Sequence, residues 1–136
     1  MKKLAYIFFL TVLVALASCT NSSEKVNRPS EWIGNWQAEW ETPPEAYPGV
    51  DDMEFYMDGM FAFTDEDLTV TNNGYPGCIF AVDTLKHTQF WKISNDTLIT
   101  YNDESTPGMT YKITSKEEGR VKLQLMEDIF VTLSKQ

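Results

Sequence analysis

The sequence MTYKITSKEEGRVKLQLMEDIFVTLS at residues 109–134 decides the fold, because its side chains alternate between apolar and polar. Alternation at every second residue is typical of antiparallel strands with one face buried and the other in water. The stretch therefore predicts three consecutive β-strands. Their apolar positions are Met109, Tyr111 and Ile113, then Val121, Leu123 and Leu125, then Ile129, Val131 and Leu133.

Shorter alternating runs continue toward the N-terminus, separated by residues that favour turns. The turn pairs are Asp58-Gly59, Asn73-Gly74, Asn95-Asp96, Pro107-Gly108 and Glu118-Gly119. Asp58-Gly59 is the clearest two-residue hairpin, because type I′ turns need residues that adopt positive φ. Sequential hairpins without a long helix predict an all-β fold, a small antiparallel up-and-down β-barrel, since closure removes exposed sheet edges. We expect about eight to ten short strands, near 35–41, 53–57, 60–64, 68–72, 78–83, 87–93, 97–102, 109–114, 120–126 and 129–134.

The segment before the first strand is ambiguous. Trp32, Trp36 and Trp40 recur every four residues, which fits one face of a helix or of a strand. Gly34 disfavours a helix, so we expect a helical turn over about 30–33 and then a strand. Residues 42–52 are too rich in proline for a central strand, and they predict a loop over one end of the barrel.

The N-terminus has the parts of a secretory signal, with basic residues at 2–3, an uncharged apolar run at 4–16 and small residues after it. The tetrad Leu16-Ala17-Ser18-Cys19 resembles the bacterial lipobox. That resemblance implies cleavage before Cys19 and lipid on its thiol, although an ordinary signal with a nearby cysteine is the alternative. We therefore expect a removed signal peptide at 1–18, a lipidated cysteine and flexible tether at 19–30, and a barrel domain at 31–136. The location would be the bacterial cell envelope, anchored by lipid to the outer membrane and facing either the periplasm or the surface.

Charge excludes one class of partner. The chain has 11 basic and 20 acidic residues, and loss of Lys2 and Lys3 with the signal leaves a net charge of 9 − 20 = −11. Nucleic-acid binding depends on basic contacts to phosphate, so it is not expected. Once Cys19 carries lipid, Cys78 has no partner for an intramolecular disulfide, and we interpret it as a buried inert thiol.

The string Trp32-Ile33-Gly34-Asn35-Trp36 resembles the opening Gly-x-Trp motif of lipocalins. The strings at 55–59 and 91–98 are similar to hairpins of small lipocalin-like lipoproteins of Bacteroidota, so the resemblance covers roughly 32–134. It implies that Trp36 plugs the closed end of the barrel beneath a late basic side chain, either Lys135 or Arg120. The sequence lacks the later Thr-Asp-Tyr motif and the C-terminal helix of larger lipocalins, which leaves strand number and cavity size open.

Aromatic residues on successive predicted strands suggest two different functions. In the first, they line a pocket for a small apolar or amphipathic molecule. In the second, they fill a narrow core, and the protein is an interaction, accessory or inhibitor module that binds an envelope protein through its outer face or its 42–52 loop. Exposed Tyr47, Tyr56 or Phe130 would favour the second function. The aromatic candidates are Trp40, Phe55, Phe63, Phe80, Trp91 and Tyr111.

Catalysis and metal binding find little support. His87 is the one histidine, and no Gly-x-Ser-x-Gly elbow occurs. The acidic runs at 51–52 and 65–67 lack calcium-loop spacing, so we expect a non-enzyme without metal or cofactor. Asp83-Thr84-Leu85 and Asp96-Thr97-Leu98 resemble the O-glycosylation sequon of exported Bacteroidota proteins, which makes Thr84 and Thr97 candidate sites; ordinary turn residues are the alternative.

Overall fold

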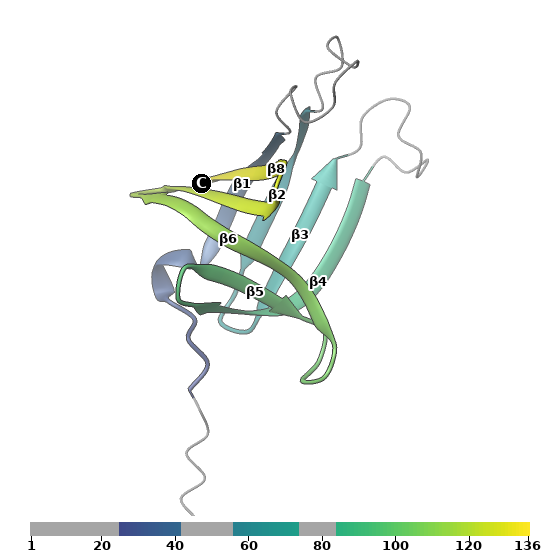
Figure 1. Ribbon diagram of the computed structural model, residues 1–136, viewed down its shortest axis with the longest axis vertical. Coiled ribbons are helices and arrows are strands. Elements are labelled where there is room, and N and C mark those ends of the chain that lie inside the picture. The colour runs from purple at the N-terminus through teal and green to yellow at the C-terminus, as the bar shows by residue number, and fades with distance from the viewer. Residues whose placement is uncertain (1–24, 42–55, 74–83) are drawn as a thin grey trace, which may run out of the picture.

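The structure is a computed structural model that describes residues 25–41, 56–73 and 84–136. Within these ranges, eight antiparallel strands form one sheet closed into a barrel, in chain order, with β8 returning to pair with β1 (Figure 1). The predicted all-β up-and-down barrel is confirmed. The elements are η1 (Ser30–Trp32), β1 (Gly34–Glu41), β2 (Tyr56–Phe63), β3 (Asp67–Asn73), β4 (Thr84–Ser94), β5 (Thr97–Tyr101), β6 (Pro107–Glu117), β7 (Arg120–Met126) and β8 (Ile129–Lys135).

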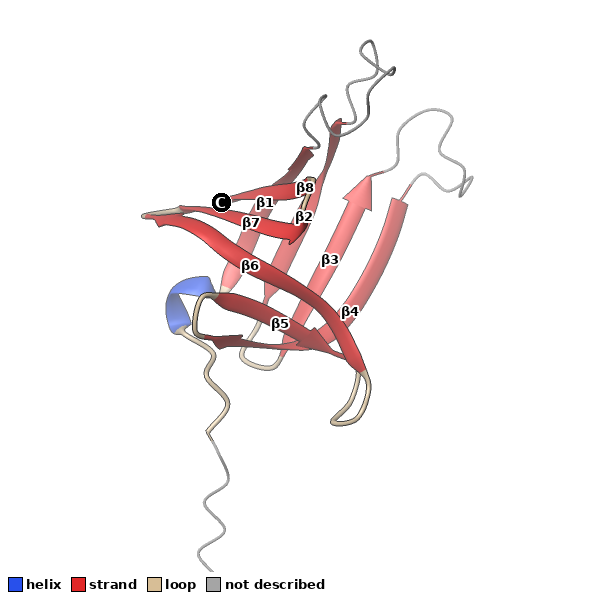
Figure 2. Cartoon of the chain, in the orientation of Figure 1, coloured by secondary structure: helices blue, strands red, loops and turns tan. Residues whose placement is uncertain are grey.

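Two predicted hairpins occur where the sequence placed them. Asn95-Asp96 joins β4 to β5, and Asn95 adopts a φ of 51°. Glu118-Gly119 joins β6 to β7, and Gly119 has a φ of 70°. Left-handed backbone favours asparagine and glycine, which is why these local signals are reliable. The predicted helical turn is also present as η1, drawn in blue in Figure 2.

The hairpin predicted at Asp58-Gly59 is wrong, and the predicted strands 53–57 and 60–64 are replaced by one strand, β2. Asp58 pairs with Glu39 of β1, and Gly59 lies between Ala38 of β1 and Asn72 of β3. A Cβ on Gly59 would overlap the carbonyl oxygen of Thr71. The glycine therefore permits close approach of two strands and does not make a turn.

The turn predicted at Pro107-Gly108 is also wrong, because both residues belong to the start of β6. The chain turns earlier, at 102–106, where the Asp103 carboxylate accepts hydrogen bonds from the backbone of Ser105 and Thr106, each at 2.8 Å. The strand predicted at 78–83 lies outside the described residues. Its successor, predicted at 87–93, begins earlier, at Thr84.

The core is built mainly from aromatic side chains. The Phe61 ring centroid lies 5.7 Å from that of Trp40 and 5.8 Å from that of Tyr111, and the Phe63 centroid lies 4.9 Å from that of Trp91. All five side chains are buried. Edge-on and tilted aromatic contacts of this kind fill a small barrel without a central void between the rings.

The predicted tether is shorter than expected, because Asn27 and Arg28 are hydrogen-bonded to the barrel. Ile93 N donates to Asn27 O at 2.9 Å, and the Asn27 side-chain amide donates to Ile93 O at 3.1 Å. Residues 27 and 28 of the predicted tether are therefore bound to the barrel. Among the residues described, none forms a helix long and apolar enough to cross a bilayer.

Candidate functional site at the distal end of the barrel

Two tryptophans seal one end of the barrel, which we call the tryptophan end. Trp32 and Trp36 are buried with ring centroids 6.1 Å apart, and Trp36 Nε1 donates to Trp32 O at 2.7 Å. Lys135 Nζ lies 5.2 Å from the Trp36 ring centroid and donates to Glu31 O at 2.7 Å. Of the two basic residues suggested by the lipocalin resemblance, Lys135 therefore covers Trp36. Arg120 lies exposed at the start of β7.

A second lysine repeats this arrangement over Trp32. Lys116 Nζ lies 5.9 Å from the Trp32 ring centroid and 2.9 Å from Glu31 Oε1. The hydrogen bond from Lys116 is the largest cause that lowers the pKa of Glu31 from its ordinary value. Because both side chains are about half exposed, water screens most of this interaction. Rings and lysine stems cover this end, and a hollow of about 590 Å³ lies among Glu31, Trp32, Trp36, Lys116 and Lys135.

The N-terminal segment is fixed near the same end. Arg28 donates from Nε to Trp91 O at 2.7 Å, from Nη1 to Asp65 O at 3.2 Å and from Nη2 to the Tyr101 hydroxyl at 2.9 Å. Toward its N-terminal side the segment lies beside Ser94 and Asn95, at the β4–β5 turn. The purple segment that precedes η1 in Figure 1 thus lies at the tryptophan end.

The described aromatic residues of the predicted pocket lie in the hydrophobic core. Trp40, Phe63, Trp91 and Tyr111 are all buried and pack against other rings. Burial raises the pKa of Tyr111 to about 12, because the apolar surroundings disfavour its anion. Phe55 and Phe80, the other two candidates, lie outside the described residues.

The opposite, distal end differs, because side chains on the inner faces of its strands remain accessible. Leu85 continues the face of β4 that buries Trp91 and Ile93, yet 47% of it is exposed. Met109 continues the face of β6 that buries Tyr111, yet 52% of it is exposed. Met57 occupies the corresponding place on β2 and is half-buried. We call these three side chains, which lie on inner faces toward the distal ends of their strands, the apolar rim.

An unsatisfied polar atom lies at the same end. Asn72 follows Leu68 and Val70 on the inner face of β3, and it pairs with Leu85 in the register of β3 and β4. Its Oδ1 is buried and has no hydrogen-bond donor within the described part of the chain. Buried oxygens are normally hydrogen-bonded, and leaving one unpaired costs about 1–3 kcal/mol. This acceptor beside an exposed leucine suits a molecule with a polar and an apolar part.

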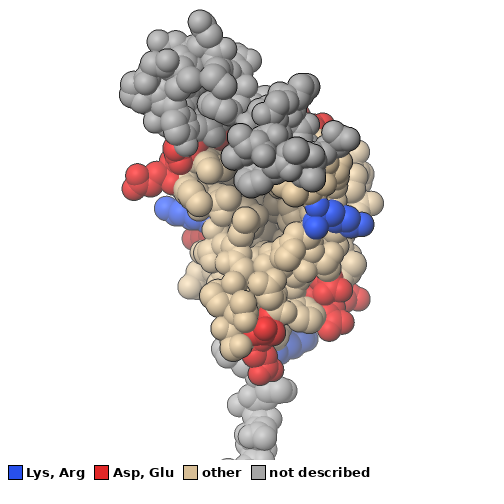
Figure 3. Space-filling view, turned by 90° about the vertical axis from the view of Figure 1, so that its right-hand side faces the viewer, with Lys and Arg blue, Asp and Glu red and all other residues tan. Residues whose placement is uncertain are grey.

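A polar network links the neighbouring strands at this end. The buried Thr100 hydroxyl lies 2.9 Å from Gln89 Oε1 and accepts from Met109 N at 2.7 Å, so it links β4 to β6. Asn102 Oδ1 accepts from Gln89 Nε2 at 3.0 Å and lies 3.3 Å from His87 Nε2. The side of the molecule that carries β4 is hollowed and uncharged at its centre, with the charged side chains that this view shows around its margin (Figure 3).

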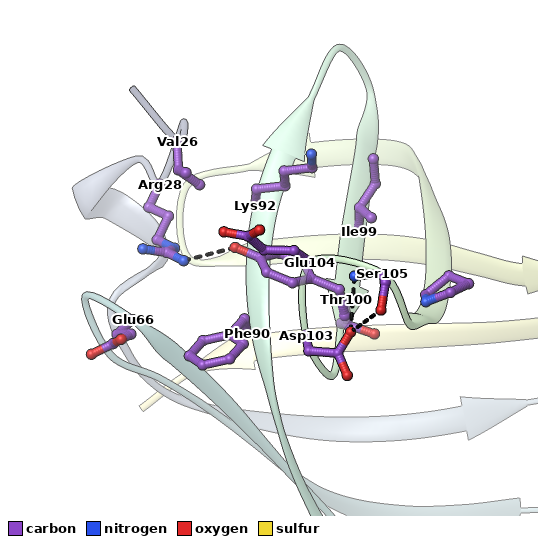
Figure 4. Close-up of a pocket in the computed structure, with 12 residues that line it drawn as sticks. Val26, Arg28, Glu66, Phe90, Lys92, Ile99, Thr100, Asp103, Glu104 and Ser105 are labelled. Atoms are coloured by element: carbon purple, nitrogen blue, oxygen red, sulfur yellow. Dashed lines mark hydrogen bonds between the residues drawn. The ribbon is translucent and has the colours of Figure 1, made fainter. Parts of the chain in front are cut away.

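A groove of about 720 Å³ lies on the outer wall (Figure 4). Phe90 and Tyr101 form its apolar floor with ring centroids 5.5 Å apart, and Lys92 Nζ lies 5.9 Å from the Tyr101 centroid. Arg28 closes one side through its bond to the Tyr101 hydroxyl. The remaining lining includes the carboxylates Glu66, Asp103 and Glu104. Because both signs of charge occur here, the groove selects neither anions nor cations.

The other predicted sites are placed as follows. Thr84 is exposed at the start of β4, and Thr97 is half-buried at the start of β5. Phe130 is half-buried, with Lys122 Nζ 5.1 Å from its ring centroid. Within the described ranges, no three His, Cys, Asp or Glu side chains are arranged to hold a metal ion. Cys19, Tyr47, Cys78 and the acidic pair at 51–52 lie outside the described residues, as does the predicted 42–52 loop, and the Tyr56 side chain is also not described.

Sequence reasoning missed the distal rim, although part of its signal was present. Met109 lies in an alternating strand, which predicts that its side chain faces the core. Alternation gives the face of a residue but not its height in the barrel. Leu85 lay before the predicted start of its strand. No feature of the neighbouring sequence predicts the unpaired oxygen of Asn72, because that oxygen is buried by residues of other strands.

Comparison with known proteins supports the fold alone. No family model matches the sequence, and no curated protein matches it. Among solved structures, the chain is similar to an uncharacterized protein from Bacteroides eggerthii DSM 20697. The TM-score is 0.51 at 15% identity, and the match covers 77% of this chain and 99% of the other.

Proposed function

We propose that the protein is an envelope lipoprotein, held on the membrane by lipid at Cys19, whose lipocalin-like barrel binds a small amphipathic molecule at its distal end. The observation that carries the binding site is the pairing of exposed Leu85 with Asn72, whose buried Oδ1 has no donor in the described chain. A hydroxyl or amine of the ligand would donate to Asn72. Its apolar part would cover Leu85, Met109 and Met57.

The filled core sets the size of the ligand. Tyr111 and Phe61 are buried beneath the rim, and their ring centroids lie 5.8 Å apart. A ligand therefore lies across the rim and does not extend down the barrel axis. This geometry favours a short or flat amphipathic molecule over a long acyl chain.

The anchor would direct this end away from the membrane. Lys25 lies near the turn at Asn95, at the tryptophan end, and Cys19 precedes Lys25 by six residues. Six extended residues span at most about 20 Å. A lipid on Cys19 would therefore hold the tryptophan end close to the bilayer and leave the rim accessible from the envelope space.

Native mass spectrometry of the protein isolated from its own host tests the binding. We expect an extra mass that is released on unfolding and that is lost in Asn72→Leu and Met109→Ser. Met60→Ser is the matched control, because Met60 is an exposed methionine on the outer face of β2. A releasable mass that persists in both rim variants, or no such mass at all, contradicts the site.

Membrane attachment is tested separately. Replacement of Cys19 by serine should move the protein from the membrane fraction to the soluble fraction and remove the covalent lipid mass from the chain. Fractionation unchanged by Cys19→Ser would reject the anchor without bearing on the rim.

A second candidate function, binding of an envelope protein on the outer wall, is favoured by the half-buried Phe90–Tyr101 pair in its groove. Aromatic side chains surrounded by polar ones are typical of the centres of protein interfaces. Crosslinking from a photoreactive residue at position 90 in host cells would give a defined protein adduct under this alternative. Under the ligand proposal, no defined protein adduct would form from position 90.

A further inference from the structure

The two halves of β4 have different neighbours. Residues from Thr84 to Phe90 pair with β3, whereas residues from Phe90 to Ser94 pair with β5. Phe90 alone has a strand partner on both sides. Each half of β4 therefore has one edge along which no described strand runs.

The N-terminal segment of the chain covers the free edge of the half from Phe90 to Ser94. Ile93 N donates to Asn27 O, and Arg28 Nε donates to Trp91 O at 2.7 Å. The segment that precedes β1 thus supplies hydrogen-bond partners to the half of β4 that β3 leaves uncovered. Natural sheets cover their edges in this way, because an unpaired edge is a template for another strand.

The second edge, from Thr84 to Thr88, has no such cover in the described chain. β5 ends at Tyr101, and the following Asn102 bonds to β4 through the side chains of His87 and Gln89, while its backbone N–H donates to Thr106 O. The β5–β6 loop then turns away from the upper part of β4 (Figure 1). All five residues of this edge are exposed. In an antiparallel pair, every second residue directs its N–H and C=O away from its partner, here away from β3.

The side chains on this edge select the kind of strand that can be added. Lys86 and His87 stand at its middle in a chain with a net charge of −9. The Asp103 carboxylate is engaged on its own loop, where it accepts hydrogen bonds from the Ser105 and Thr106 hydroxyls. Opposite charges on facing strands stabilise the pair, and like charges destabilise it. A two-fold pairing with a second copy centred here would bring two Lys86 side chains together.

We propose that the Thr84–Thr88 edge of β4 is a docking site for an extended, acidic segment of another protein, which adds to the sheet as a strand. Main-chain hydrogen bonds would supply affinity, and Lys86 would supply the preference for acidic side chains. The site is separate from the proposed ligand rim. Lys86 points outward on β4, whereas Leu85 points inward, so each can be changed without the other.

The test uses the protein as isolated from its host membranes and three synthetic probes. The first is the acetylated hexapeptide amide Thr-Val-Glu-Val-Thr-Val; the second has Lys in place of Glu, and the third is the acidic peptide with N-methylated backbone amides. Hydrogen exchange is followed on peptides that cover residues 84–88. We expect slower exchange there with the acidic peptide and no slowing with the N-methylated one, because methylation removes the donors.

Charge reversal gives the second readout. Lys86→Glu should lower the affinity for the acidic peptide by roughly threefold to tenfold and raise the affinity for the lysine peptide, in keeping with cross-strand charge energies. Lys92→Glu is the matched control, since it makes the same change on the same face of β4 but in the covered half; it should alter either affinity less than twofold. Equal binding of all three peptides overturns the proposal. So does protection of 84–88 that rises with protein concentration alone, which would assign the edge to a second copy.

Discussion

Lys135 and Trp36 are direct neighbours across the β1–β8 pair, and the Lys135 ammonium lies 5.2 Å from the centre of the Trp36 ring. The same ammonium donates to Glu31 O at 2.7 Å, so one side chain from the last strand ties η1 and the first strand together. Barrel closure brings the two ends of the domain into this contact. The tryptophan end therefore depends on the C-terminal strand being in place.

The first prediction concerns this contact. Lys135→Met keeps the apolar stem but removes the charge and the donor, and we expect the free energy of unfolding to fall by about 1 kcal/mol. Urea denaturation followed by tryptophan fluorescence measures it. Lys112→Met, at another exposed lysine, is the control and should change the free energy of unfolding by less than about 0.5 kcal/mol. Equal effects of the two substitutions would show that the ring contact is not stabilising.

The second prediction concerns Gly59. Gly59→Ala should destabilise the protein by at least about 3 kcal/mol, because the added methyl overlaps the Thr71 carbonyl oxygen and the backbone must move. Gly119→Asn is the comparison. Gly119 has a φ of 70° in a turn with open space around it, and asparagine tolerates that conformation. An equal fall in the midpoint temperature of thermal unfolding for both substitutions would contradict the close approach of β2 and β3.

The third prediction concerns Arg28. Its three bonds reach three different elements, and lysine cannot reproduce the planar geometry of the guanidinium group. Arg28→Lys should therefore speed amide exchange at Ile93, whose N–H bonds to Asn27, by about tenfold, while exchange in β7 stays unchanged. Lys25→Met, on the same segment but exposed, should leave Ile93 unaffected. Unaltered exchange at Ile93 in Arg28→Lys would mean that Asn27 alone fixes the segment.

The fourth prediction uses the raised pKa of Tyr111. With a folded pKa of about 12 and an ordinary value of 10.0, the folded state holds the phenol proton more tightly than the unfolded state. This contribution is complete below about pH 10, and about 3 kcal/mol is lost as the pH rises through 12. Tyr111→Phe should therefore lose less stability between pH 9 and pH 11.5 than the parent protein. Identical pH profiles in urea denaturation would place the phenol in contact with water.

The hairpin turns show how far local sequence reaches. Asn95 and Gly119 both adopt positive φ, a property of the residue itself, so their turns could be predicted from adjacent letters. Gly59 carried an equally strong local signal and lies inside a strand, because β1 and β3 pair with it on both sides. Local preference decided the turn only where tertiary pairing did not compete.

Some features of the candidate site could also be predicted from the sequence, and others required the structure. Trp36 could be identified from the Gly-x-Trp motif, and its cover could be narrowed to two basic residues. The choice of Lys135 over Arg120 required the register of β8 against β1. The described members of the aromatic set were correctly placed on inner faces. Whether they lined a pocket or filled the core depended on ring contacts between strands far apart in the chain.

The sequence by itself determined the strand alternation and the all-β barrel, because these follow from side-chain periodicity and turn residues, whereas the place of Trp36 was implied by the lipocalin resemblance. Only the tertiary structure decided that the core is filled, that Arg28 binds the barrel and that Asn72 keeps an unpaired oxygen beside Leu85. The physical reason is that burial and hydrogen bonding depend on barrel closure. Closure brings together residues such as Arg28 and Tyr101, 73 positions apart, whose sequence neighbours carry no record of the contact.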